Sequence, residues 1–196
     1  GWIGGYSGPI RRELLVLSRS PEGAEIPIST DGLTVMFNKA VVPLTTLDKG
    51  RDKSIPLNIT PSVDGKFFWL GTHGFIFRPT EPLIPATAYK VEMPAGVVSV
   101  DGYKLDKPVT WEFSTVSPDV LTWEPSENQM LLPGNASLFF RFNLAMNTSD
   151  VEKKLAVIDA ATGQMLLTKR DYVWGDDGHT LRVQFKDELP WESKIN

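Results

Sequence analysis

The two histidines are the side chains of this sequence best suited to bind a metal ion or act as a general base near neutral pH. They are His73 and His179, and each lies in a short glycine-containing turn, residues 71–74 and 178–180. The two turns fall at nearly equivalent places in two halves of the chain, about a hundred residues apart. Residues at matching places in separate domains are poorly placed to share an ion. We therefore predict that both histidines are turn residues.

The acidic run Asp176-Asp177-Gly178 offers oxygen ligands of the kind that calcium prefers. It lacks the alternating spacing of carboxylates and the distal glutamate of a calcium loop, so a solvated hairpin turn is the better interpretation. A second, mixed-sign group is predicted to be a solvated loop surface. Its members are Asp48, Arg51, Asp52 and Lys53.

Aromatic side chains gather in one stretch of the chain: Phe67, Phe68, Trp69, Phe75 and Phe77. An exposed row of such rings would suit a carbohydrate ligand, whereas a hairpin with its turn at residues 70–74 would place the rings in the core. Trp69 has a counterpart in Trp174 at the spacing of the internal repeat described below. This recurrence favours the core.

Other kinds of site find no support in the sequence. The chain has no G-x-S-x-G, H-E-x-x-H, phosphate-loop or dinucleotide motif and no cysteine, so we predict no enzyme activity, no catalytic residue, no metal and no cofactor. The net charge is −4, with 20 basic and 24 acidic residues and no basic stripe, which gives no support for nucleic-acid binding. No apolar run approaches the roughly 20 residues that cross a bilayer. Three short N-x-S/T patterns, at Asn58, Asn135 and Asn147, are expected to be chance matches.

Alternating apolar and polar residues predict strands throughout the chain. The clearest are residues 33–37, 88–93, 110–115, 137–142 and 180–185. Turn residues separate them, and 15 prolines and 16 glycines interrupt most stretches that could be helical. Helical turns are expected only at residues 148–155 and 44–49. Short strands at this spacing predict an antiparallel β-sandwich.

An internal repeat sets the domain organisation. Residues 17–21, 35–40, 69 and 82–83 have counterparts at 121–125, 140–145, 174 and 188–189, 104 to 106 residues further on. A repeat of this length is the size of one immunoglobulin-like sandwich. We predict a lead-in at residues 1–13 and two tandem Ig-like domains, 14–116 and 117–196. The counterpart of strand 88–93 begins near Ile195, so the second domain is expected to lack its last strands and to leave an unpaired edge.

The first domain also resembles a known family. The segments that carry the resemblance are 37–47 (FNKAVVPLTTL), 56–61 (PLNITP), 68–72 (FWLGT), 86–96 (ATAYKVEMPAG) and 111–115 (WEFST). They are similar to the N-terminal region of bacterial alpha-2-macroglobulin-like proteins. The second domain keeps only a frame common to bacterial Ig-like domains.

The resemblance implies a large exported or lipid-anchored protein in the periplasm or at the cell surface, which traps target proteases. Cleavage of a bait region in such proteins triggers collapse around the protease, and many members capture it with a thioester in a C-x-E-Q motif. The family's functional residues match no position here, and the resemblance instead implies a scaffold role beside neighbouring domains of the same polypeptide. Residues 1–9 lack the features of a signal peptide, so a targeting segment is expected upstream. The alternative is an Ig-like spacer or adhesive module of an S-layer protein, adhesin or exported hydrolase.

Overall fold

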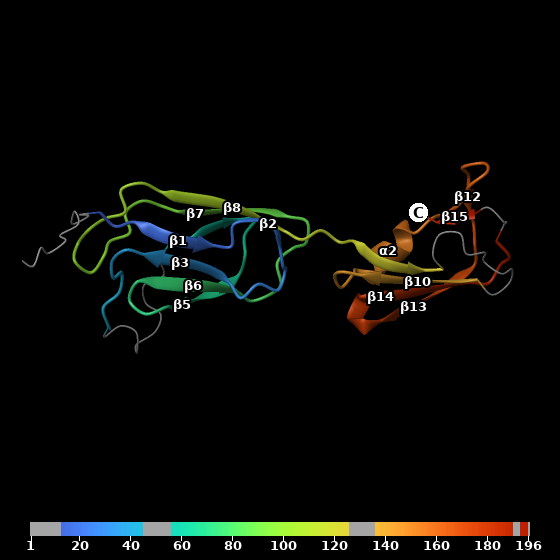
Figure 1. The fold of residues 1–196 in the computed structure, drawn as a ribbon, viewed down its shortest axis with the longest axis horizontal. Helices are drawn as coiled ribbons and strands as arrows, with labels where there is room; N and C mark the ends of the chain where they lie inside the picture. The colour runs from blue at the N-terminus through green and yellow to red at the C-terminus, as the bar shows by residue number, and fades with distance from the viewer. Residues whose placement is uncertain (1–12, 45–55, 126–135, 190–192, 196) are drawn as a thin grey trace, which may run out of the picture. The chain divides into compact units, whose positions relative to one another are not determined.

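The computed structural model describes residues 13–44, 56–125, 136–189 and 193–195, and divides the chain into two compact units, Gly1–Ser117 and Pro118–Asn196 (Figure 1). Strands make up nearly all of the regular structure, which confirms the predicted all-β class. Several sequence predictions lie outside the described residues: the lead-in 1–12, nearly all of the helical turn 44–49, the charged group 48–53 and the pattern at Asn135.

The described residues of the first unit form eight strands in two sheets (Figure 1). They are β1 (Val16–Ser20), β2 (Gly23–Ile26), β3 (Leu33–Phe37), β4 (Asn58–Thr60), β5 (Gly65–Trp69), β6 (Gly74–Pro79), β7 (Ala88–Met93) and β8 (Val109–Thr115). The strand orders are β1-β3-β6-β5 and β2-β8-β7-β4. All neighbours are antiparallel except β2 and β8, which run parallel. The sequence did not indicate that parallel pair, because β2 is short and mostly exposed and has no clear alternation.

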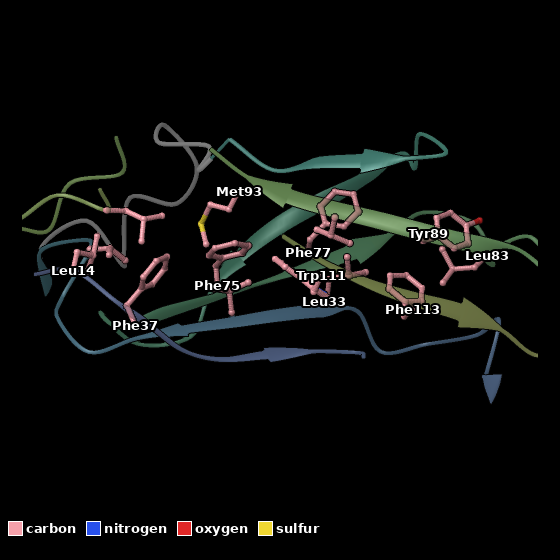
Figure 2. Close-up of a cluster of buried hydrophobic side chains, with 14 residues drawn as sticks. Leu14, Leu33, Phe37, Phe75, Phe77, Leu83, Tyr89, Met93, Trp111 and Phe113 are labelled. Carbon is pink, nitrogen blue, oxygen red and sulfur yellow. The ribbon is translucent and has the colours of Figure 1, made fainter. Parts of the chain in front are cut away.

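Alternate residues of both sheets fill the core of the first unit. Leu33, Val35 and Phe37 of β3 are buried, as are Trp111 and Phe113 of β8, and Figure 2 shows these two strands contributing to one cluster. Fully burying a side chain of this kind contributes about 1.5–3 kcal/mol relative to leaving it exposed. The apolar alternation of the sequence is therefore what binds the two sheets together.

A tyrosine fixes one end of this core. Tyr89 is buried, its ring stacks on Phe113 with centroids 5.1 Å apart, and its hydroxyl accepts a hydrogen bond from the Ile84 backbone N–H at 3.0 Å. The buried Thr115 hydroxyl accepts a bond from Thr87 N–H at 3.1 Å and donates to the Ile84 carbonyl. A tyrosine that bonds back to the backbone a few residues upstream is typical of immunoglobulin-like sandwiches.

The second unit has a main sheet of order β13-β14-β10-β9 and a smaller sheet of order β12-β11-β15. Its elements are β9 (Val120–Glu124), β10 (Ser137–Phe142), α2 (Thr148–Lys154), β11 (Val157–Asp159), β12 (Met165–Leu166), β13 (Arg170–Gly175), η1 (Asp176–Gly178), β14 (Thr180–Phe185) and β15 (Ser193–Ile195). The helix predicted at 148–155 is present: Asn147 caps its first turn, where its side-chain oxygen accepts from Asp150 N–H at 3.2 Å.

The core of the second unit lies on one face of its main sheet. Leu138 and Phe142 of β10 and Leu181, Val183 and Phe185 of β14 are buried there with Val157 of β11. Helix α2 packs against the same cluster through Val151. Side chains at alternate positions of β10 and β14 thus supply most of this core.

Candidate functional site

Both histidines lie in the hairpin turns predicted for them, and the structure uses their backbone. The His73 carbonyl accepts a hydrogen bond from Phe37 N–H at 2.7 Å, and the His179 carbonyl accepts one from Phe142 N–H at 2.8 Å. The His73 ring is exposed, with Nδ1 2.8 Å from Thr72 Oγ1. The His179 ring has Nδ1 2.8 Å from the Asp176 carbonyl oxygen. In these contacts neither imidazole ring meets a carboxylate or a second ring nitrogen.

A second pair of matching contacts is made by two asparagines, one directly after β3 in the first unit and one directly after β10 in the second. The Asn38 side-chain oxygen accepts from Leu15 N–H at 2.8 Å, while Asn38 N–H donates to the Leu15 carbonyl at 3.0 Å. Asn143 has the same two-way relationship with Asp119, at 2.8 Å and 3.1 Å. Each asparagine therefore ties the strand it follows to the residues just before the neighbouring edge strand.

The acidic run Asp176-Asp177-Gly178 forms η1, the turn between β13 and β14. Asp176 and Asp177 both adopt left-handed backbone conformations, with φ of 50° and 48°. The Asp176 carboxylate lies 3.9 Å from Arg141 Nη1. In the part of the chain that the structure describes, no group of three or more His, Cys, Asp or Glu side chains is arranged to hold a metal ion.

The aromatic stretch divides between core and surface. Phe67 packs against Phe75 and Phe77 with ring centroids 5.5 Å and 5.0 Å apart, and Trp69 meets Phe75 edge-on at 6.5 Å. Phe68 points the other way, is 41% exposed and lies under the Arg78 guanidinium at 5.2 Å. The core interpretation therefore holds for four of the five rings, and these rings do not form one exposed platform.

Trp174, the counterpart of Trp69 in the second unit, also packs against the core. Its ring stacks on Phe142 with centroids 6.1 Å apart, and its Nε1–H donates to Glu152 Oε1 of α2 at 2.8 Å. This part-buried contact gives the tryptophan a structural role in holding α2 on the sheet.

Two N-x-S/T patterns fall on described residues. Asn58 is exposed at the start of β4, whereas the Asn147 side chain caps α2.

A small polar cluster that the sequence did not indicate lies on the loop between β7 and β8. Ser99 Oγ donates to Asp101 Oδ1 and accepts from Tyr103 N–H at 2.9 Å. Lys39 Nζ lies 3.4 Å from Asp101 Oδ2 and 4.3 Å from the centre of the Tyr103 ring. The Ser99 hydroxyl, with help from Lys39, holds the pKa of Asp101 below its usual range. The only sequence signal was the turn Asp101-Gly102, which says nothing of a lysine about 60 residues earlier.

A groove of about 420 Å³ runs between β1 and the start of β8. Its lining includes Glu13, Arg19, Asp106 and Lys107, with Val16 and Val109. The charges have both signs, and no nucleophile and base meet there within hydrogen-bond distance among the described contacts. We therefore interpret the groove as a gap beside the edge strand β1 and not as a catalytic site.

Among the described residues, no helix has the length and apolar character needed to cross a bilayer.

Comparison with solved structures gives distant likenesses. One is L,D-transpeptidase 3 from Mycobacterium tuberculosis, with 12% identity, a TM-score of 0.38 and coverage of 84% of this chain and 54% of the enzyme. Another is the N-terminal part of the bacterial S-layer protein SbsC, with 13% identity, a TM-score of 0.33 and coverage of 93% and 43%.

A sequence relative is the alpha-2-macroglobulin homolog of Nostoc sp. (strain PCC 7120 / SAG 25.82 / UTEX 2576), 24% identical over 147 residues. The match covers 71% of this chain but only 8% of the relative, so the chain spans a small part of that protein's length. It agrees with the resemblance carried by the FNKAVVPLTTL and FWLGT segments. The family model described as bacterial Ig-like domain matches residues 11–115, more than half of the chain. The chain therefore belongs to the bacterial Ig-like domain family.

Proposed function

We propose that this chain is a non-catalytic scaffold segment of a bacterial alpha-2-macroglobulin-like protease inhibitor. The observation that carries the proposal is the extent of the match to the Nostoc alpha-2-macroglobulin homolog. It covers 71% of the chain, which is more than the 117 residues of the first unit, so the similarity enters both units. The similarity therefore extends beyond the residues 11–115 that the Ig-like family model matches.

The use of polar side chains in the structure supports a scaffold role. Four polar side chains form hydrogen bonds with the backbone of neighbouring strands and corners: Asn38, Asn143, Tyr89 and Thr115. These contacts fix the strand ends and corners of each unit, and they are structural contacts to the backbone. A unit built in this way is suited to a scaffold that holds neighbouring domains in place.

We infer further that the two units are tandem Ig-like repeats, with boundaries at residues 14–116 and 117–196. Their main sheets have matching strand orders, β1-β3-β6-β5 and β9-β10-β14-β13 read from the first strand of each. The carbonyls of His73 and His179 and the side chains of Asn38 and Asn143 make the same bonds in both. On this proposal the chain contacts neighbouring domains of the same exported polypeptide, and the whole protein binds target proteases.

The test is a trapping assay on the full-length polypeptide that contains this chain. A trapped protease keeps its activity on a small peptide substrate but loses activity on a large protein, and we expect that difference after one cleavage of the inhibitor. Removal of residues 14–189 should abolish it. If the full-length protein leaves cleavage of both substrates unchanged, or traps equally well without the segment, the proposal is wrong and a spacer role is favoured.

A further inference from the structure

We infer that the inner face of the second unit's main sheet, beside β9, receives a further β-strand of the same polypeptide, patterned like β8. The inference rests on the proposal that the polypeptide is longer than this chain. It concerns how the second unit is completed, and it does not depend on what the whole protein inhibits.

The first unit shows how this face is covered when a strand lies over it. Arg19 of β1 pairs with Val35 of β3, and both side chains lie on the face of the sheet that meets the core. Val35 is 0% exposed, and the Arg19 guanidinium lies 5.9 Å from the centre of the Trp111 ring of β8. Strand β8 therefore covers the Arg19–Val35 pair.

The matching pair in the second unit is Trp123 of β9 and Phe140 of β10. Phe140 stacks beside the buried Phe142, with ring centroids 6.4 Å apart, and packs against the core cluster, so this pair lies on the core face of the sheet. Trp123 is nevertheless 48% exposed and Phe140 is only half-buried. A tryptophan on the core face with half its surface in water indicates a missing cover.

The smaller sheet of the second unit has an open edge in the corresponding place. In the first unit β7 pairs with β4 on one side and with β8 on the other. In the second unit β15 pairs with β11 in the same antiparallel sense, Val157 opposite Ile195 and Asp159 opposite Ser193. Within the described ranges β15 has no strand on its other side, where a counterpart of β8 would lie.

These two features together specify the chemistry of the missing strand. It must offer backbone donors and acceptors to the free edge of β15 and bulky apolar side chains, at every second position, to Trp123 and Phe140. Strand β8 has this pattern, since Trp111, Phe113 and Thr115 are buried while Thr110 and Glu112 are not. A segment that follows β15 in the same polypeptide can reach the site through a loop like that between β7 and β8.

The deciding experiment compares the 196-residue chain with the same chain extended by the residues that follow Asn196 in its gene. Hydroxyl-radical footprinting with mass spectrometry measures the oxidation rate of Trp123. We expect it to fall about fivefold in the extended protein, because the exposed fraction drops from 48% to that of a core side chain. Backbone amide exchange in β15 should slow by at least about tenfold, because those groups join a sheet ladder. Trp174 serves as an internal control and should react equally in both proteins, since Phe142 and Glu152 already cover it.

Equal oxidation of Trp123 in the two proteins would overturn the inference. So would protection of Trp123 that appears in the 196-residue chain as its concentration rises, because a second copy would then be the occupant. In the extended protein, replacing the inward residues of the added strand by aspartate should restore the oxidation of Trp123 while leaving Trp174 unchanged. The outcome is independent of the trapping assay, so failure of either proposal can be recognised by itself.

Discussion

Asn143 holds Asp119 in the second unit by the same two hydrogen bonds with which Asn38 holds Leu15 in the first. In each case the side-chain oxygen accepts at 2.8 Å and the backbone N–H donates back. The Asn38 amide nitrogen also donates to the Glu13 carbonyl at 3.0 Å. The two asparagines thus join the ends of adjacent strands without lying in either strand.

Asn38→Ala is expected to destabilise the first unit by about 1–2 kcal/mol, because it removes two side-chain bonds and leaves the part-buried Leu15 N–H unpaired. Asn143→Ala should cost less, about 0.5–1 kcal/mol, because the Asp119 N–H that bonds to its side-chain oxygen is exposed and can bond to water instead. Urea unfolding followed by tryptophan fluorescence measures both. Asn58→Ala on the exposed edge strand β4 is the matched control, and an effect of Asn38→Ala no larger than that of the control would contradict the assigned role.

Tyr89→Phe should destabilise the first unit by about 1–2 kcal/mol, since the ring still stacks on Phe113 while the Ile84 N–H loses its acceptor. Thermal unfolding by calorimetry gives the size of the effect. Tyr103→Phe is the control, because the Tyr103 contacts to Ser99 use the backbone. Equal melting temperatures for the Tyr89 variant and the unmodified protein would show that the hydroxyl does not fix the corner.

Gly74→Ala is expected to destabilise the first unit by about 1–3 kcal/mol through overpacking. A Cβ at this position would lie against Met36 Sδ and 2.7 Å from the Val35 carbonyl oxygen, and the carbonyl cannot move without disturbing β3. Gly175→Ala, whose Cβ would meet only Thr180 Oγ1 at 3.0 Å, should cost less. The comparison uses urea midpoints, and a smaller effect at Gly74 than at Gly175 would be inconsistent with this packing.

Asp101 should make the stability of the first unit depend on pH at the acid end. The pKa of Asp101 in the folded protein is lowered, chiefly by the Ser99 hydroxyl. At acidic pH the folded state therefore binds fewer protons than the unfolded state. Its contribution is complete above the unfolded pKa and is lost as the pH falls through the lower, folded pKa. Asp101→Asn should therefore reduce the urea midpoint at neutral pH and have less effect at about pH 2. An equal effect at both pH values would rule out this linkage.

Much of the fold could be predicted from the sequence because its signals are local. The alternation in residues 33–37 and 180–185 gave two central strands, and the composition of residues 148–155 gave the helix α2. The all-β class and the Ig-like character of the first unit followed from such segments, and both are confirmed.

Contacts between distant residues could not be predicted in this way. The parallel pairing of β2 with β8 has no periodic signal, and the cluster of Lys39, Ser99 and Asp101 depends on how a loop folds back. Phe68 was grouped with core aromatics, although alternation in β5 places it on the opposite face from Phe67 and Trp69. The roles of the His73 and His179 carbonyls were likewise hidden, because backbone bonds between strands leave no mark on residue type.

The most direct test of the central claim, that this chain is scaffold and has no inhibitory or catalytic chemistry of its own, is a protease assay on the isolated 196-residue chain. Serine, cysteine, aspartic and metalloproteases are each incubated with an excess of the chain, and cleavage of a small peptide and of a large protein is followed. Every protease is expected to keep its full activity on both substrates. Stoichiometric inhibition of any one of them, on either substrate, would contradict it.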